Sequence, residues 1–282
     1  MNLSPRERAM LAEMGVSWPQ ASPEPVVVAA PPAPSVSAVP EPEVPQPQPQ
    51  PQPRPPPLQP TASPWPEQPS WEALQAAVAS CLRCGLCKTR RHTVFGVGHP
   101  RAAVMVVGEA PGEQEDRQGE PFVGAAGQLL DRMLGAIGLS RTSMTEGSGS
   151  AQPSAPGTAH DAHQVFITNT VKCRPPQNRN PEPAELAACE PVLHRQMELV
   201  RPRLVLAMGR FAAQQLLHTD EAIGRLRGRV HRITGAGAIW AGERGVPVVV
   251  TYHPAYLLRN PIDKAKAWDD LCLALDTLAA QA

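Results

Sequence analysis

Residues 103–112 read Ala-Val-Met-Val-Val-Gly-Glu-Ala-Pro-Gly, and this stretch decides the fold class. Its apolar run, 103–107, stops at a glycine, which is typical of a short strand buried on both faces. Similar apolar runs predict three further strands, at 165–171, 204–208 and 246–251. Helical patterns occupy 71–79, 124–137, 183–200, 210–217 and 267–280. Because apolar strands that alternate with helices form parallel sheets covered on both faces, we expect an α/β fold, a three-layer α/β/α sandwich around a central four-stranded parallel sheet.

The segments outside this pattern have a different composition. Residues 19–70 hold 20 of the 35 prolines, and such a stretch cannot bury enough apolar surface to offset its chain entropy. We therefore expect a disordered, Pro-rich tail over 1–70, with a short amphipathic helix at 6–14, and one folded domain over 71–282. The Ser-, Gly-, Pro- and Ala-rich stretch at about 142–164 predicts a flexible surface insertion.

Charge and hydropathy exclude some classes of protein and leave others open. The formal net charge is zero, but residues 172–232 carry eleven Lys and Arg against six Asp and Glu. This bias is compatible with a polyanionic partner and equally with a solvated surface. No apolar run approaches the ~20 residues of a membrane span, and the first residues lack the apolar segment of a signal peptide. We expect a cytoplasmic protein with no membrane partner and with reduced thiols.

The cysteines have the spacing of a metal or cluster site. Cys81, Cys84 and Cys87 precede the first predicted strand, Cys173 follows the second, and Cys189 lies in the next helix. Two cysteines separated by two residues can bind one metal ion or one cluster corner, and Cys173 and Cys189 would supply two more thiolates. Four thiolates suit a structural zinc or a [4Fe–4S] cluster. The first pair is either Cys81 with Cys84 or Cys84 with Cys87.

Polar motifs follow three of the four predicted strands, where parallel sheets bind their ligands. The loop after the first strand contains Glu109 and Glu115, which could position or activate water. Phe122, placed between glycines, could stack on a base or fill the core. Asn169 ends the second strand and offers a donor beside an acceptor, which suits a nucleobase edge or a turn. His253 follows the fourth strand and could donate a hydrogen bond to developing negative charge.

Leu257, Leu258 and Arg259 come shortly after this histidine. On a loop, two apolar side chains beside an arginine would resemble a wedge next to a phosphate contact.

Taken in order, these motifs resemble the uracil-DNA glycosylase superfamily, and its family 4 above all, the iron–sulfur enzymes of bacteria and archaea. The resemblance covers roughly residues 71–275, interrupted by 142–164. The matching motifs are Gly-Glu-Ala-Pro-Gly with Glu115-Asp116, Pro-Phe-Val-Gly, Thr-Asn-Thr-Val-Lys-Cys-Arg-Pro-Pro-Gln-Asn-Arg and His-Pro-Ala-Tyr-Leu-Leu-Arg-Asn-Pro.

The resemblance implies a [4Fe–4S] cofactor with a structural role. In the family, a Cys-x-x-Cys pair stands ten residues before the Val-Phe-Gly turn, here 94–96. That placement selects Cys81 and Cys84, with Cys173 and Cys189 as the second pair, and makes Cys87 an extra cysteine.

The resemblance also implies an activity, uracil excision in base excision repair. The enzyme would flip uracil out of DNA and hydrolyse its N-glycosidic bond, leaving an abasic site. Phe122 would stack on the base, Asn169 would pair with its N3–H and O4, and His253 would stabilise the departing anion through O2. Leu257, Leu258 and Arg259 would fill the space that the base leaves in the DNA stack and would contact phosphate.

Two positions depart from the best-known branch of the superfamily. That branch has Asp where this chain has Ala110, and Tyr where it has Gly112; the Tyr helps to exclude thymine. We expect Glu115 or Glu113 to take over that exclusion. Water positioning would fall to Glu109 or Glu115, with Glu109 preferred.

Several alternatives remain at the level of sequence. A related branch traps the sugar covalently through a His in the loop after the second strand, but this chain has no His between 173 and 189, so turnover is favoured. A non-catalytic DNA-binding module and a zinc-stabilised α/β domain are the competing hypotheses. The expected partners are uracil-containing DNA, single- or double-stranded, and a repair or replication protein bound by the tail. A nucleoid-associated monomer is the default expectation.

Overall fold

The computed structural model describes residues 69–141 and 163–281. The predicted tail, its helix at 6–14 and the insertion at 142–164 lie outside the described residues, apart from 69–70 and 163–164. Within the described residues, the chain forms a six-stranded sheet of order β1-β3-β2-β4-β6-β5. Among the helices of these two ranges, none is long and apolar enough to cross a membrane.

Four parallel strands form the centre of the sheet and confirm the predicted parallel core. They are β2 (Val104–Gly108), β3 (Val165–Asn169), β4 (Leu204–Met208) and β6 (Val246–Thr251). Every residue of these strands is buried, as expected for strands covered on both faces. In the register of the sheet, Gly108 lies beside Asn169, and Met208 beside Thr251. All four carboxyl ends therefore reach the same edge.

The sheet also has two edge strands that the sequence did not predict. β1 (Val97–Gly98) and β5 (Val230–Ile233) add antiparallel edge strands. β1 has only two residues, one of them glycine, and β5 reads Val-His-Arg-Ile with three of its four residues not buried. Neither has the continuous apolar run that marks a central strand, because an edge strand has a face or side open to solvent.

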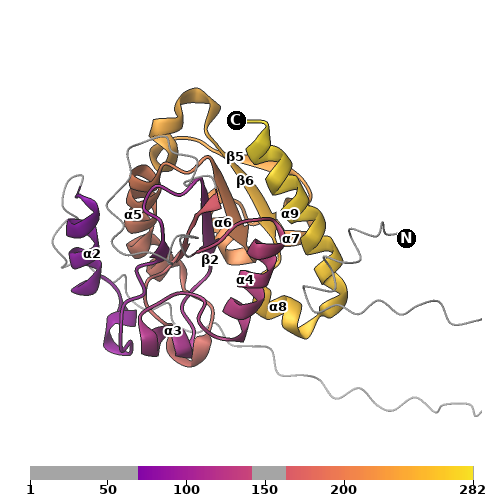
Figure 1. Cartoon of the computed structure of the whole chain (residues 1–282). Helices are drawn as coiled ribbons and strands as arrows, with labels where there is room; N and C mark the ends of the chain where they lie inside the picture. Colours follow the sequence, from indigo (N-terminus) through magenta and orange to yellow (C-terminus); the bar gives the residue numbers. More distant parts are fainter. Residues whose placement is uncertain (1–68, 142–162, 282) are drawn as a thin grey trace, which may run out of the picture. The chain divides into compact units, whose positions relative to one another are not determined.

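Helices cover both faces of the sheet, which confirms the three-layer arrangement (Figure 1). One face is covered by α4 (Ala125–Ala136), α8 (Pro254–Arg259) and α9 (Lys264–Ala279). The other is covered by α2 (Trp71–Ala79), α5 (Pro183–Val200), α6 (Arg210–Leu217) and α7 (Ile223–Leu226). The remaining elements are α3 (Glu113–Gln118) and the 3₁₀ turns η1 (Gly85–Lys88), η3 (Pro176–Asn178), η4 (Ala236–Arg244) and η5 (Pro261–Asp263).

Local sequence explains where the helices begin. The Ser70 side chain accepts a hydrogen bond from the Ala73 N–H and caps α2, and Pro183 occupies the first turn of α5. α4 buries Leu129, Leu130 and two further apolar side chains against the sheet, each worth roughly 1.5–3 kcal/mol. The α2, α5 and α6 predictions agree with the observed bounds, whereas α3 and α8 fall in segments expected to be loops.

Candidate active site

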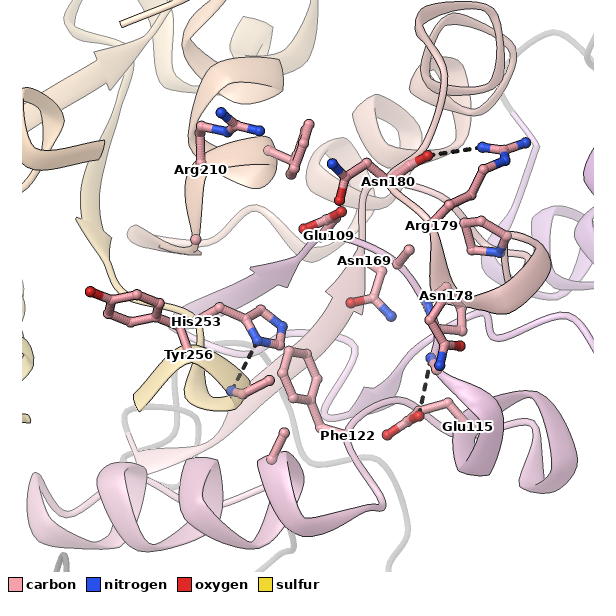
Figure 2. Close-up of a pocket in the computed structure, with 18 of the residues that line it drawn as sticks. Glu109, Glu115, Phe122, Asn169, Asn178, Arg179, Asn180, Arg210, His253 and Tyr256 are labelled. Carbon is pink, nitrogen blue, oxygen red and sulfur yellow. Dashed lines mark hydrogen bonds between the residues drawn. The ribbon is translucent and has the colours of Figure 1, made fainter. Parts of the chain in front are cut away.

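The carboxyl ends of the four parallel strands open into a cavity of about 660 Å³ (Figure 2). The cavity brings together eight of the ten non-cysteine residues predicted for the site. These are Glu109, Ala110, Gly112, Glu115, Phe122, Asn169, His253 and Arg259. The two predicted residues that do not line it are Leu257 and Leu258.

Asn169 has a buried acceptor without a partner. The residue is 2% exposed, and its Oδ1 atom has no hydrogen-bond partner. A buried polar atom of this kind costs about 1–3 kcal/mol, and sites that bind a ligand commonly retain such a cost. Its backbone carbonyl accepts a hydrogen bond from the Lys172 ammonium at 2.6 Å, which holds the end of β3 in place. The side-chain amide is thus buried at the anchored end of β3, and its Oδ1 can accept from a donor that enters the cavity.

His253 is held as a neutral hydrogen-bond donor. Its Nδ1 accepts a hydrogen bond from the Ala255 N–H at 3.1 Å, so in the neutral ring the proton resides on Nε2. Burial, with a smaller contribution from the Arg259 charge, lowers the pKa of His253 to about 4. At neutral pH the ring therefore carries no charge and keeps one N–H to donate.

Phe122 lies beside this ring. The two ring centroids are 5.4 Å apart with an interplanar angle of 27°, a stacked arrangement. Phe122 has a left-handed backbone, φ 54°, and Arg141 donates hydrogen bonds to its carbonyl and to that of Pro121. It belongs to the core and lines the cavity at once, so both roles considered for it from the sequence are compatible with its position.

Glu109 follows β2 directly and lines the cavity. Burial raises the pKa of Glu109 to about 7, and the nearby Arg210 charge partly opposes the rise. Its backbone carbonyl accepts hydrogen bonds from the Thr170 hydroxyl at 2.5 Å and from the Val171 N–H at 3.3 Å. These contacts join the loop after β2 to the loop after β3. A carboxyl with a pKa near neutrality can change its charge under working conditions.

Glu115 is a brace between two loops. Its carboxylate accepts hydrogen bonds from the N–H groups of Gly112 (3.1 Å), Val123 (3.1 Å) and Gly124 (3.4 Å). A Cβ on Gly112 would come within 2.7 Å of Glu115 Oε2, so the small residue makes room for this contact. Glu113, the other acid considered for excluding thymine, does not line the cavity and pairs with Arg117.

The segment predicted as a wedge loop is helix α8. Leu257 is fully buried in the core beneath it, so it lacks the exposed side chain that a DNA contact requires, and that part of the prediction was wrong. The helical period explains this, because successive residues point in different directions. Leu258 is 45% exposed, and Arg259 lines the cavity.

Some polar residues of the cavity were not predicted from the sequence. Arg210 begins α6 after Gly209, whose φ is 91°, and it lines the cavity together with Asn178 and Arg179. Arg179 is bound bidentately by Glu185 at 2.6 and 2.9 Å. The glycine between β4 and α6 was an available signal, because it marks the fourth strand end at the same sheet edge.

Five cysteines line a second, small hollow. They are Cys81, Cys84, Cys87, Cys173 and Cys189. The Arg90 guanidinium donates to the Cys173 sulfur at 3.1 Å, and the Lys172 N–H donates to the Cys189 sulfur at 3.3 Å. Burial raises the pKa of Cys173 to about 11 and that of Cys189 to about 12, while nearby cations oppose the rise. Both are therefore thiols at neutral pH until a metal or cluster displaces the proton.

The donor set fits an iron–sulfur cluster. Thiolates about 2.3 Å from one zinc ion lie roughly 4 Å apart. Within 69–141 and 163–281, no trio of the cysteines has sulfur atoms that all lie within 4.8 Å of one another. The N–H groups of Arg90 and Lys172 that donate to sulfur suit a cluster, whose properties depend on such hydrogen bonds. All five cysteines adjoin the hollow, so position alone does not separate Cys87 from the predicted ligands.

Comparisons with known proteins agree with the motifs. The family model of the uracil DNA glycosylase superfamily matches residues 95–272. The chain is 40% identical over 194 residues to a type-4 uracil-DNA glycosylase of Sulfurisphaera tokodaii, covering 68% of this chain and 77% of that protein. It is 40% identical to one of Archaeoglobus fulgidus, covering 65% and 81%, and 35% identical to one of Thermotoga maritima, covering 67% and 83%.

Proposed function

The chain belongs to the uracil DNA glycosylase superfamily, and we propose that it excises uracil from DNA by hydrolysing the N-glycosidic bond in the cavity at the ends of β2, β3, β4 and β6. The relatives described above are named as type-4 uracil-DNA glycosylases, which supports a hydrolase of N-glycosyl bonds in DNA repair. A base stacked in a duplex must leave the stack to reach such a cavity.

Base recognition is assigned to Asn169, and its unpartnered Oδ1 is the observation that carries the proposal. Uracil presents an N–H at N3 and a carbonyl at O4, which match a side-chain amide that accepts at one atom and donates at the other. Cytosine presents an acceptor at N3 and an amino group at C4, so both contacts would become repulsive. Phe122 would stack on the base beside them.

Bond cleavage leaves charge on both fragments. The departing uracil becomes an anion, and the neutral His253 would donate its Nε2 proton as a hydrogen bond to O2. The sugar becomes an oxocarbenium-like cation. Glu109 in its ionised form would stabilise this cation and orient the attacking water. Glu115 supports the site indirectly, because all its observed contacts are to backbone N–H groups of the two loops.

An iron–sulfur cluster is the proposed cofactor, bound by Cys81, Cys84, Cys173 and Cys189. When bound, it would supply iron–thiolate bonds that cross-link the segment before β1, the loop after β3 and helix α5. Cys173 lies four residues after Asn169 in the chain, so this cross-link would stiffen the recognition loop. Hydrolysis of the glycosidic bond requires no redox step.

The finer expectations stay predictions. DNA contacts are proposed for the exposed Leu258 and for Arg259, which adjoins the cavity. The partner of the tail, the preference for single- or double-stranded DNA, the monomeric state and nucleoid association stay predictions as well.

A strand-cleavage assay tests the proposal. Protein is incubated with oligonucleotides that carry U opposite G, U opposite A or U in a single strand, and the products are treated with alkali. We expect alkali-labile strands with the wild type and with His163→Ala, an exposed histidine that does not line the cavity. Asn169→Ala and His253→Ala should abolish the signal. Intact strands from cluster-loaded wild-type protein would contradict the proposal and favour a binding module, and an adduct on a denaturing gel would favour a covalent trap.

A further inference from the structure

A third cluster of ligand-type side chains lies apart from both the cavity and the cysteine hollow. It consists of Glu190 and His194 on α5 and His218 at the end of α6. Their ligand atoms all lie within 4.8 Å of one another. None of the three lines the active-site cavity or the hollow of cysteines. The chemistry of excision and the cysteine cluster leave this group without a role.

The geometry of the two helices produces the cluster. Glu190 and His194 are four residues apart, so they lie on one face of α5, one turn apart. His218 ends α6 with a left-handed backbone, φ 48°, a conformation that residues other than glycine adopt infrequently. Both helices pack on the same face of the sheet, which brings the end of one beside the middle of the other.

The distances are close to those of a first-row metal site. Glu190 Oε1 is 3.8 Å from His194 Nε2 and 4.0 Å from His218 Nδ1. Two nitrogen or oxygen ligands of a tetrahedral zinc, each about 2.0–2.1 Å from the ion, lie roughly 3.3 Å apart. Side-chain rotations that shorten each Glu190–histidine distance by roughly half an ångström, and that bring the two imidazole nitrogens together from within 4.8 Å, would complete the arrangement.

A second shell of contacts is already in place. The Gln215 amide, on α6, donates a hydrogen bond to Glu190 Oε1 at 3.0 Å. A contact of this kind orients a ligating carboxylate and is a regular feature of metal sites. The side chains of Glu190 and His194 are each 27% exposed, and that of His218 is 69% exposed. An ion could therefore enter from solvent and keep a water in its fourth position.

We propose that Glu190, His194 and His218 form a binding site for a divalent first-row metal ion of the zinc class, which joins α5 to α6. Two imidazoles and one carboxylate favour zinc, nickel, copper or cobalt over magnesium or calcium, because the latter prefer oxygen ligands alone. α5 carries Cys189, and α6 begins at Arg210 in the cavity. A bound ion would thus link α5, which carries a cysteine of the hollow, to α6, which carries an arginine of the active-site cavity.

Direct titration tests the proposal. Holoprotein with its iron content measured is titrated with zinc chloride in a calorimeter, while the visible absorption of the cluster is followed in parallel. We expect one zinc per chain with unchanged cluster absorption. His194→Ala and His218→Ala should each weaken binding at least tenfold, and Gln215→Ala should weaken it by about tenfold, as outer-shell changes do. His163→Ala is the matched control and should bind zinc as the wild type does.

Two further readouts keep the test decisive. Saturating zinc should raise the melting temperature of the wild type by about 5–10 °C at a hundredfold excess over Kd, and should leave the double variant His194→Ala/His218→Ala unchanged. Uracil excision should persist in the double variant, because neither residue touches the cavity, and this separates the metal site from the proposed function. The proposal would be overturned if the wild type bound no zinc. It would also be overturned if the double variant took up as much zinc as the wild type while the cluster absorption was lost, because zinc would then bind at the cysteines.

Discussion

Uracil excision should rise with pH through neutrality, and Glu109 should cause the rise. Burial holds the pKa of this carboxyl at about 7, so it is protonated below that pH and ionised above it. Because the ionised form is the one proposed to stabilise the sugar cation, the active fraction should be about one tenth at pH 6, one half at pH 7 and nine tenths at pH 8. The rate of the chemical step should therefore increase roughly fivefold from pH 6 to 7 and less than twofold from pH 7 to 8.

The measurement is single-turnover excision from a uracil-containing oligonucleotide between pH 5.5 and 9, at constant ionic strength. Glu109→Gln should have a lower excision rate, and its rate should no longer increase between pH 6 and 8 (the rising limb of the pH profile). Arg210→Ala should shift the limb to higher pH, because the Arg210 charge favours the ionised carboxylate. Arg210→Lys keeps the charge and should restore the limb.

Two other groups need to be separated from Glu109. His253 has a pKa of about 4 and stays neutral across the whole range, so it cannot produce the limb. Burial lowers the pKa of Lys172 to about 7, and its ammonium binds the Asn169 carbonyl. Loss of the Lys172 proton would weaken this contact and lower the rate as the pH rises, which is opposite in sign to the effect of Glu109, and Glu109→Gln should retain only that fall. A flat wild-type profile, or a limb that survives in Glu109→Gln, would refute the reasoning.

Three further predictions concern recognition, packing and the cofactor. Asn169→Asp should reduce the discrimination between uracil and cytosine by about 5- to 150-fold, because a bidentate contact to a base is worth about 1–3 kcal/mol. Paired excision assays on uracil and cytosine would measure this ratio. Unchanged discrimination would contradict the assignment of Asn169. Leu257→Ala should lower the free energy of unfolding by about 2–5 kcal/mol, because the side chain is fully buried. Leu258→Ala should change the free energy of unfolding by less than about 0.5 kcal/mol and should weaken DNA binding, because this side chain is exposed. Denaturant titration and DNA-binding assays measure the two effects, and equal destabilisation by both variants would contradict the buried and exposed positions. Cys81→Ala should lower the iron and acid-labile sulfide content of purified protein, whereas Cys87→Ala should retain both; the reverse result would make Cys87 the ligand.

The central sheet was predictable because burial leaves a local mark. A strand covered on both faces must be apolar at every position, and the runs 104–108 and 204–208 are apolar throughout or stop only at glycine. Edge strands have no such requirement, so 230–233 resembles an ordinary polar segment. The positions of Asn169 and His253 were also predictable, because each follows a strand whose carboxyl end reaches the common edge.

Contacts between distant segments were not predictable from local pattern. Glu115 was expected to act on water or on the base, yet its carboxylate bridges Gly112 and Val123, a contact that exists only once two loops pack together. Arg210 is far from Glu109 in the chain and reaches it only because β4 lies next to β2. The short helix α8 buries Leu257 and exposes Leu258, which the residue types alone do not distinguish.

By itself, the sequence determined the strand order along the chain, the helices between the strands and the kinds of side chain at the strand ends, since all of these depend on neighbours within a few residues. The tertiary structure decided the charge state of Glu109 and His253, the bracing role of Glu115 and the meeting of α5 with α6 at Glu190, His194 and His218. These depend on burial and on distances across the fold. Packing sets both of them, and local periodicity does not encode either.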